Sequence, residues 1–75
     1  MTPRELGARL AAARHAAGLS QRQVADKLGV HQPSIVVIEN GRRTVTALEL
    51  AAMARLYRVS TDDLLALAEQ VKRAA

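Results

Sequence analysis

The chain has 75 residues, a formal net charge of +4 and no cysteine, so it has the length of one small domain, without disulfides or cysteine-bound metal. Tyr57 is its only aromatic residue, and the many alanines and leucines favour closely packed helices over a sheet. The positive charge favours an anionic partner, although a soluble domain with a mildly basic surface would carry the same charge.

The first helix is expected to begin at Thr2-Pro3-Arg4-Glu5, which has the pattern of a capping box with proline at the first helical position. Gly18 is expected to end it. The residues predicted to form its buried stripe, at helical spacing, are Leu6, Leu10, Ala13 and Ala17.

Two further helices are expected to cross through a short turn. Ser20-Gln-Arg-Gln23 is a second capping box, and the helix that it opens runs to about Leu28. The next helix begins at His31 or Gln32, carries Pro33 in its first turn and stops at Asn40-Gly41.

The turn between these helices has the residues that a tight crossing needs. Gly29 lies where the chain leaves the first of the two, a position that commonly requires a positive φ. Ala25 is small enough for a close crossing. The residues expected to face inward are Val24, Leu28, Val30, Ile35 and Ile38. Residues 20–41 therefore predict a helix-turn-helix, whose second helix usually lies in the major groove of DNA.

Two more capping patterns predict the last helices. Thr46-Ala-Leu-Glu49 starts the fourth helix, and Ser60-Thr-Asp-Asp63 starts a fifth that we expect over about 61–73. The predicted inner face of the fourth helix is Ala47, Leu50, Ala51, Ala54 and Tyr57. The sequence thus predicts one compact five-helix, all-α domain over residues 1–75.

Some apolar residues do not fit a single inward face. Leu48 and Leu56 lie on the flank of the fourth helix, and the fifth helix is apolar on more than one side. The fifth helix could simply pack across the other four, but we favour a homodimer interface, since contiguous apolar surface marks contacts and a helix-turn-helix gains from a two-fold partner. The interface residues predicted are Leu64, Leu67, Ala68 and Val71.

The outward face of the third helix is the predicted base-reading surface. It consists of Gln32, Pro33, Ser34, Val36 and Val37. The Gln32 amide can pair with adenine, and Val37 can pack on a thymine methyl. Because this face has no arginine or lysine, the usual contact to guanine is missing and we expect an A/T-leaning half-site. An apolar outer face of this kind would also suit a protein partner.

Phosphate contacts are predicted on both sides of that face. Ser20 and Gln21 lie at the positive end of the second helix, where backbone N–H groups bind anions, although Gln21 could also be a solvated first-turn residue. The other predicted phosphate contacts are Arg22, Asn40, Arg42 and Arg43. Glu39 follows a buried position, and we expect it to tie the third helix to a neighbouring arginine.

No catalytic, metal or cofactor site is predicted. His15 and His31 lie on different elements and have no further ligand at metal spacing. No pattern of a nucleophile with its base or of a phosphate-binding glycine loop is present. The amino terminus has no apolar run of a signal peptide and no stretch long enough to span a membrane, so we expect a cytoplasmic protein without enzyme activity.

Three stretches resemble the Cro/CI-type (Xre) family of phage repressors, restriction-modification controllers and bacterial regulators: Leu19–Val30, Ile35–Arg43 and Leu56–Leu65. The resemblance covers about residues 4–66. It implies a lambda-repressor-like five-helix fold, a double-stranded DNA operator, and a dimer that acts as a transcriptional repressor, often an autorepressor, or as an activator.

The resemblance also implies roles for single residues. It gives a phosphate contact to Gln21, base reading to Gln32, Pro33 and Val37, and backbone contacts to Asn40, Arg42 and Arg43. The chain departs from the family pattern at Pro33, Val36 and Val37, where a polar or basic side chain is usual. Residues 38–50 also resemble Xre domains paired with toxins or metallopeptidases, which leaves an antitoxin as the alternative function.

Overall fold

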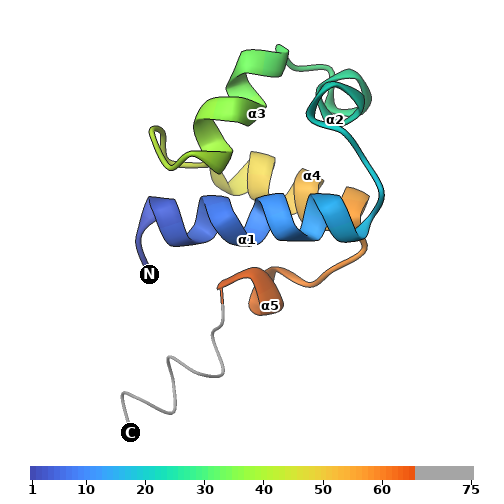
Figure 1. Cartoon of the computed structure of the whole chain (residues 1–75). Coiled ribbons are helices and arrows are strands. Elements are labelled where there is room, and N and C mark those ends of the chain that lie inside the picture. Colours follow the sequence, from blue (N-terminus) through green and yellow to red (C-terminus); the bar gives the residue numbers. More distant parts are fainter. Residues whose placement is uncertain (66–75) are drawn as a thin grey trace, which may run out of the picture.

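The computed structural model describes residues 1–65, which form five α-helices and no strand. The helices are α1 (Pro3–Ala16), α2 (Gln21–Leu28), α3 (Gln32–Glu39), α4 (Ala47–Tyr57) and α5 (Thr61–Leu65). The long α1 crosses the middle of the molecule, with α2 and α3 on one side and α5 on the other (Figure 1). The predicted all-α, five-helix fold is confirmed. The predicted continuation of the fifth helix, from residue 66 to about 73, lies outside the described residues.

Local hydrogen bonds explain where the helices begin. Gln23 N–H donates to Ser20 Oγ at 3.0 Å, and Ser20 N–H donates back to Gln23 Oε1 at 2.8 Å. The same reciprocal pair joins Thr46 and Glu49, with distances of 3.1 and 2.8 Å. Each pair satisfies backbone donors that the first turn of a helix leaves without partners. The predicted capping boxes at Ser20–Gln23 and Thr46–Glu49 are therefore confirmed.

The other two predicted caps are present in a simpler form. Glu5 N–H donates to Thr2 Oγ1 at 3.1 Å, and Asp63 N–H donates to Ser60 Oγ at 3.0 Å. Among the described residues, these two caps lack the return bond of a full box. The Thr2 and Ser60 hydroxyls still set the first residue of α1 and α5.

Gly29 shapes the turn of the helix-turn-helix. Its φ is +68°, in the left-handed region that an L side chain adopts only at a cost. This conformation lets Val30 N–H donate to Ala25 O at 2.9 Å, which closes the end of α2. The chain then turns at once into α3, which packs against both α2 and α1.

The core is aliphatic apart from Tyr57, as the composition predicts, and all five helices contribute residues to it. Its buried residues are Leu10, Val24, Ala25, Ile35, Ile38, Met53, Ala54, Tyr57 and Leu64. Leu10, Val24 and Met53 are completely excluded from solvent. Ile35 and Ile38 are buried one turn apart, so they fix which side of α3 faces inward.

Several predicted inward positions are wrong. Ala47 and Ala51 are exposed, and the buried side of α4 instead runs through Leu50, Met53, Ala54 and Tyr57. This spacing places Ala51 on the flank, and Ala47 is the first residue of α4. Ala17 follows the end of α1 and is also exposed.

Val30 and Leu64 correct two further expectations. Val30 is 37 % exposed because it lies in the turn after Gly29 rather than on a packed helix face. Leu64 was predicted at the dimer interface, but it is 4 % exposed and packs in the core of its own chain. The other predicted interface residues, Leu67, Ala68 and Val71, lie outside the described residues. Within residues 1–65, none of the helices has the length and apolarity that a membrane span requires.

Candidate nucleic-acid interface

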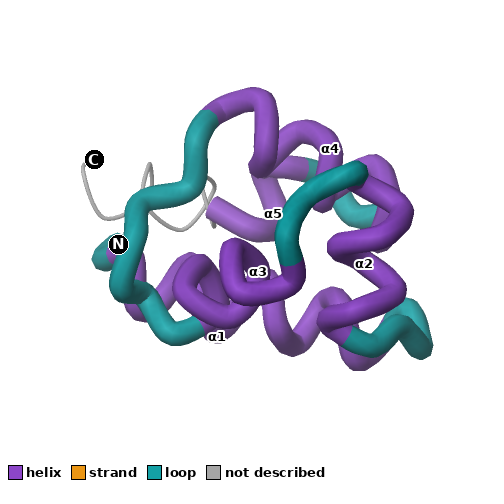
Figure 2. The backbone as a smooth tube through the Cα atoms, turned by 90° about the horizontal axis from the view of Figure 1, so that it is seen from above, coloured by secondary structure: helices purple, strands orange, loops and turns teal. Residues whose placement is uncertain are grey.

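The helix-turn-helix presents one side of α3 outward. α2 and α3 lie on the upper side of the molecule in Figure 1, and no other described helix lies in front of them when they are viewed from above (Figure 2). With Ile35 and Ile38 buried, Gln32 and Pro33 are exposed at the start of α3. The structure therefore leaves the leading end of α3 accessible to a large partner.

The side chains of the rest of the predicted base-reading face are less exposed. Ser34, Val36 and Val37 are half-buried, so they offer parts of their surface rather than extended side chains. Gln32 remains the longest polar side chain on this face, with an amide that can donate and accept. The outward side of α3 is thus mainly apolar with one amide at its leading end. This composition suits contact with thymine methyl groups and with adenine.

A buried polar network fixes α3 against α1. Arg14 Nε donates to Glu39 Oε2 at 2.7 Å and Arg14 Nη2 donates to Glu39 Oε1 at 3.1 Å, while Arg14 Nη1 donates to Leu19 O at 2.9 Å. The Arg14 and Glu39 side chains are only 9 and 5 % exposed. The hydrogen bond and the charge of Glu39 raise the pKa of Arg14, against the opposing effect of burial. The predicted tie between Glu39 and a neighbouring arginine is confirmed.

The sequence analysis missed that this arginine is Arg14. The available signal was its position four residues after Leu10, on the buried side of α1, where a charged residue needs a partner. Close by, the Tyr57 hydroxyl is buried, and no hydrogen-bond partner is found for it within the part of the chain that is described. Burial, and secondarily the Glu39 charge, raises the pKa of Tyr57 to about 12.

The same network holds Gln21 at the start of α2. Gln21 Nε2 donates to Glu39 Oε1 at 3.0 Å, so the side chain is half-buried and oriented by an acid on α3. An amide nitrogen carries two hydrogens, and this bond uses one of them. Gln21 is thus not a freely solvated first-turn residue, although its phosphate contact stays a prediction. Ser20, beside it, uses its hydroxyl as the cap of α2.

The other predicted phosphate contacts are of two kinds, exposed residues and one arginine that is paired within the chain. Asn40 and Arg42 are exposed, as is Arg22 on α2. Arg43 instead folds back onto α4, where Nη1 and Nη2 donate to Glu49 Oε1 and Oε2 at 2.9 and 2.7 Å. These bonds, followed by the Thr46 backbone N–H, lower the pKa of Glu49 to about 2. To contact a phosphate, the Arg43 guanidinium would have to leave Glu49 or bind Glu49 and the phosphate together.

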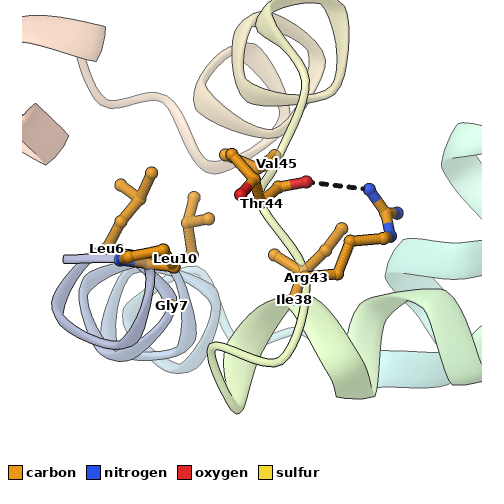
Figure 3. Close-up of a pocket in the computed structure, with 8 residues that line it drawn as sticks. Leu6, Gly7, Leu10, Ile38, Arg43, Thr44 and Val45 are labelled. Carbon is orange, nitrogen blue, oxygen red and sulfur yellow. Dashed lines mark hydrogen bonds between the residues drawn. The ribbon is translucent and has the colours of Figure 1, made fainter.

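A small cavity lies between α1, the end of α3 and the following segment (Figure 3). Leu6 and Leu10 line it from α1, and Ile38 and Val45 line it from the other side. Its volume of about 20 Å³ has room for roughly one water molecule, so it is a packing defect rather than a ligand pocket. Within residues 1–65 no three His, Asp or Glu side chains gather in a way that would hold a metal ion.

An α3 that is held outward by a tightly crossed α2, with cationic residues on its flanks, defines a helix-turn-helix protein. The chain belongs to the helix-turn-helix domain family, whose model matches residues 5–68. By fold and family it is a DNA-binding protein of the transcription-regulator class. The Cro/CI-type resemblance found in the sequence is confirmed at this level. Among curated proteins, none matches the chain significantly.

Three solved structures share the fold. The clp gene regulator ClgR from C. glutamicum is 27 % identical, with a TM-score of 0.82 over 95 % of this chain and 92 % of that one. The restriction-modification controller protein C.AhdI from Aeromonas hydrophila is 27 % identical, with a TM-score of 0.77 over 83 % of this chain and 94 % of that one. The DNA-binding domain of BldD from S. venezulae is 34 % identical, with a TM-score of 0.72 over 83 % of this chain and 93 % of that one. The antitoxin alternative gains no support from these descriptions.

Proposed function

We propose that this protein binds double-stranded DNA sequence-specifically as a homodimer and represses transcription of its own or a neighbouring operon. The observation that carries this proposal is the outward presentation of α3, with its rotation fixed by buried Ile35 and Ile38 and its leading end exposed at Gln32 and Pro33. The related gene regulator, controller protein and DNA-binding domain support the same assignment. The proposed site of action is the cytoplasm, and no enzymatic reaction is part of the proposal.

In the proposed complex α3 lies in the major groove. Gln32 pairs with adenine, and Pro33 and Val37 pack on thymine methyl groups. Ser34 and Val36 complete the face that lies against the bases. In a two-fold dimer the two α3 helices read half-sites about 34 Å apart on one side of the duplex. The predicted operator is therefore a pseudo-palindrome with A/T-rich half-sites.

The phosphate contacts flank this face. Gln21, oriented by Glu39, uses its second amide hydrogen, and the α2 amino end with Ser20 adds backbone N–H groups. Arg22, Asn40, Arg42 and, once released from Glu49, Arg43 complete the set. These contacts position the protein without reading sequence.

A salt titration tests the function. Binding of the full chain to a fluorescent duplex from its own upstream region is followed by anisotropy at several salt concentrations. The logarithm of the binding constant should fall linearly with the logarithm of salt, with a slope of about −0.9 for each phosphate contacted. An unrelated duplex of equal length is the control. Equal affinity for both duplexes, or binding that salt does not weaken, contradicts the proposal.

Two substitutions separate base reading from phosphate contact. Gln32→Ala should relax the preference at one base pair and cost about 1–3 kcal/mol on the preferred duplex only. Arg42→Ala should weaken binding to every duplex alike. If both variants bind like the wild type, the assigned reading face is wrong.

The proposed dimer contact involves Leu67, Ala68 and Val71. Leu67→Glu and Val71→Glu should convert the dimer to a monomer in sedimentation velocity, because a buried carboxylate opposes association. An unchanged sedimentation profile would exclude these residues as the interface.

A further inference from the structure

A shallow groove lies beside the end of α3 and extends from the helix-turn-helix onto α1. It has a volume of about 450 Å³ and is lined by Arg4 and Ala8 from α1 and by Glu39, Asn40 and Arg42. Arg4, Ala8, Asn40 and Arg42 are all exposed. The groove therefore brings two arginines together from positions far apart in the sequence.

Backbone packing fixes Arg4 beside the end of α3. A Cβ atom on Gly41 would lie 2.5 Å from Arg4 Cα, so only glycine lets the turn after α3 approach α1 this closely. A Cβ atom on Gly7 would likewise collide with the carbonyl oxygen of Ile38. The position of Arg4 relative to Asn40 and Arg42 is thus set by the fold.

The groove is electropositive. The Arg4 and Arg42 guanidinium groups have no hydrogen-bond or ion-pair partner among residues 1–65. Glu39 is the one acid that lines the groove, and its charge is already compensated by Arg14 at 2.7 Å. Arg4 also lies in the first turn of α1, where the helix dipole disfavours a cation. Arg4 therefore adds nothing evident to the stability of α1.

We infer that this groove holds a phosphate of the DNA backbone and that Arg4 is a DNA contact outside the helix-turn-helix. A phosphodiester accepts charge-assisted hydrogen bonds from guanidinium groups, and Arg4 and Arg42 supply these from opposite sides. Asn40 adds an amide donor. Ala8 has only a methyl group, so it lets the sugar-phosphate backbone approach α1 closely. This inference rests on the proposed function and extends its interface onto α1.

Arg9 provides a matched control for Arg4. Both arginines are exposed on α1, but Arg9 does not line the groove. Arg4→Ala and Arg9→Ala change the net charge equally, so they alter long-range attraction equally. Binding of both variants to the upstream duplex is measured over the same salt range as for the wild type. Circular dichroism confirms that each variant is folded.

The two variants should differ in their salt dependence. Arg4→Ala should reduce the magnitude of the slope by about 0.9, so that its affinity deficit against the wild type shrinks by about 3-fold between 50 and 200 mM salt. Its loss should be the same on all sequences, and Arg4→Lys should recover most of the affinity at low salt. Arg9→Ala should keep the wild-type slope.

The outcomes also separate this inference from the proposed function. If the wild type binds its duplex with a steep salt dependence but Arg4→Ala and Arg9→Ala behave alike, the groove is not a phosphate site and the function stands. If Arg4→Ala changes the preference among sequences, Arg4 reads bases and the inference is wrong. If the wild type itself shows no salt-dependent binding, both proposals are wrong.

Discussion

Replacing Arg14 by methionine tests the buried network that holds α3 in place. Methionine preserves much of the stem of arginine but removes the guanidinium group, which donates to both Glu39 oxygens and to Leu19 O. The Glu39 carboxylate, with a side chain 5 % exposed, would keep Gln21 as its remaining side-chain partner among the described residues. Removing one partner of a buried pair costs about 3–5 kcal/mol, because the other charge stays buried.

This cost is large for a domain of 75 residues. At roughly 0.05–0.15 kcal/mol per residue, its whole free energy of unfolding is about 4–11 kcal/mol. Arg14→Met should therefore lower the midpoint of urea unfolding, followed by circular dichroism, with the slope of the transition unchanged. The double variant Arg14→Met/Glu39→Met removes both charges and should lose less stability than the sum of the single changes.

Arg43→Met is the matched control for this experiment. Arg43 also pairs through two hydrogen bonds with a glutamate, but the side chains of Arg43 and Glu49 are 38 and 26 % exposed. Water screens a pair of this kind, so its loss should cost much less. If Arg14→Met destabilises the protein no more than Arg43→Met does, the Arg14–Glu39 network is not what holds α3 against α1.

Three further predictions concern the fold around the site. Gly41→Ala should destabilise the protein more than Gly18→Ala. Both glycines have a positive φ, of +71° and +73°, but only Gly41 has the backbone of Arg4 against it. Equal unfolding midpoints of the two variants would contradict that close contact. Hydrogen bonds from Arg43, and secondarily from the Thr46 backbone, lower the pKa of Glu49 from 4.5 to about 2. The charged carboxylate therefore stabilises the fold above pH 4.5 and loses this effect as the pH falls toward 2. Glu49→Gln should flatten that part of the stability profile, and an unchanged profile would contradict the role of these bonds. Tyr57, the only tyrosine, should ionise near pH 12 in an ultraviolet titration. Tyr57→Phe should unfold at the same temperature as the wild type or a higher one, because it removes a buried hydroxyl without a partner among residues 1–65. A lower unfolding temperature would indicate a partner for that hydroxyl.

The sequence alone predicted the helices well because their ends depend on neighbours within a few residues. The Ser20–Gln23 and Thr46–Glu49 boxes form where the pattern places them, and Gly29 adopts the positive φ that the turn requires. Capping and turn formation involve groups three to five positions apart, so the sequence contains both partners of each interaction. The same locality explains why the helix-turn-helix could be recognised before its packing was known.

The predicted reading face followed from the same local logic. Once Ile35 and Ile38 point inward, the helical period determines which residues of α3 point out. The structure leaves Gln32 and Pro33 exposed, as expected, and shows that Val36 and Val37 are half-buried. How far each side chain projects depends on neighbouring helices, which periodicity does not describe.

Only the tertiary structure decided which distant groups meet. It paired Arg14 with Glu39, turned Arg43 toward Glu49, buried Met53 and Leu64 in the core, and placed Arg4 beside the end of α3. Arg14 and Glu39 are 25 residues apart, and their contact depends on how α1 packs against α3. A residue's neighbours in sequence specify its backbone conformation, whereas its partner across a helix crossing depends on the packing of all the helices together.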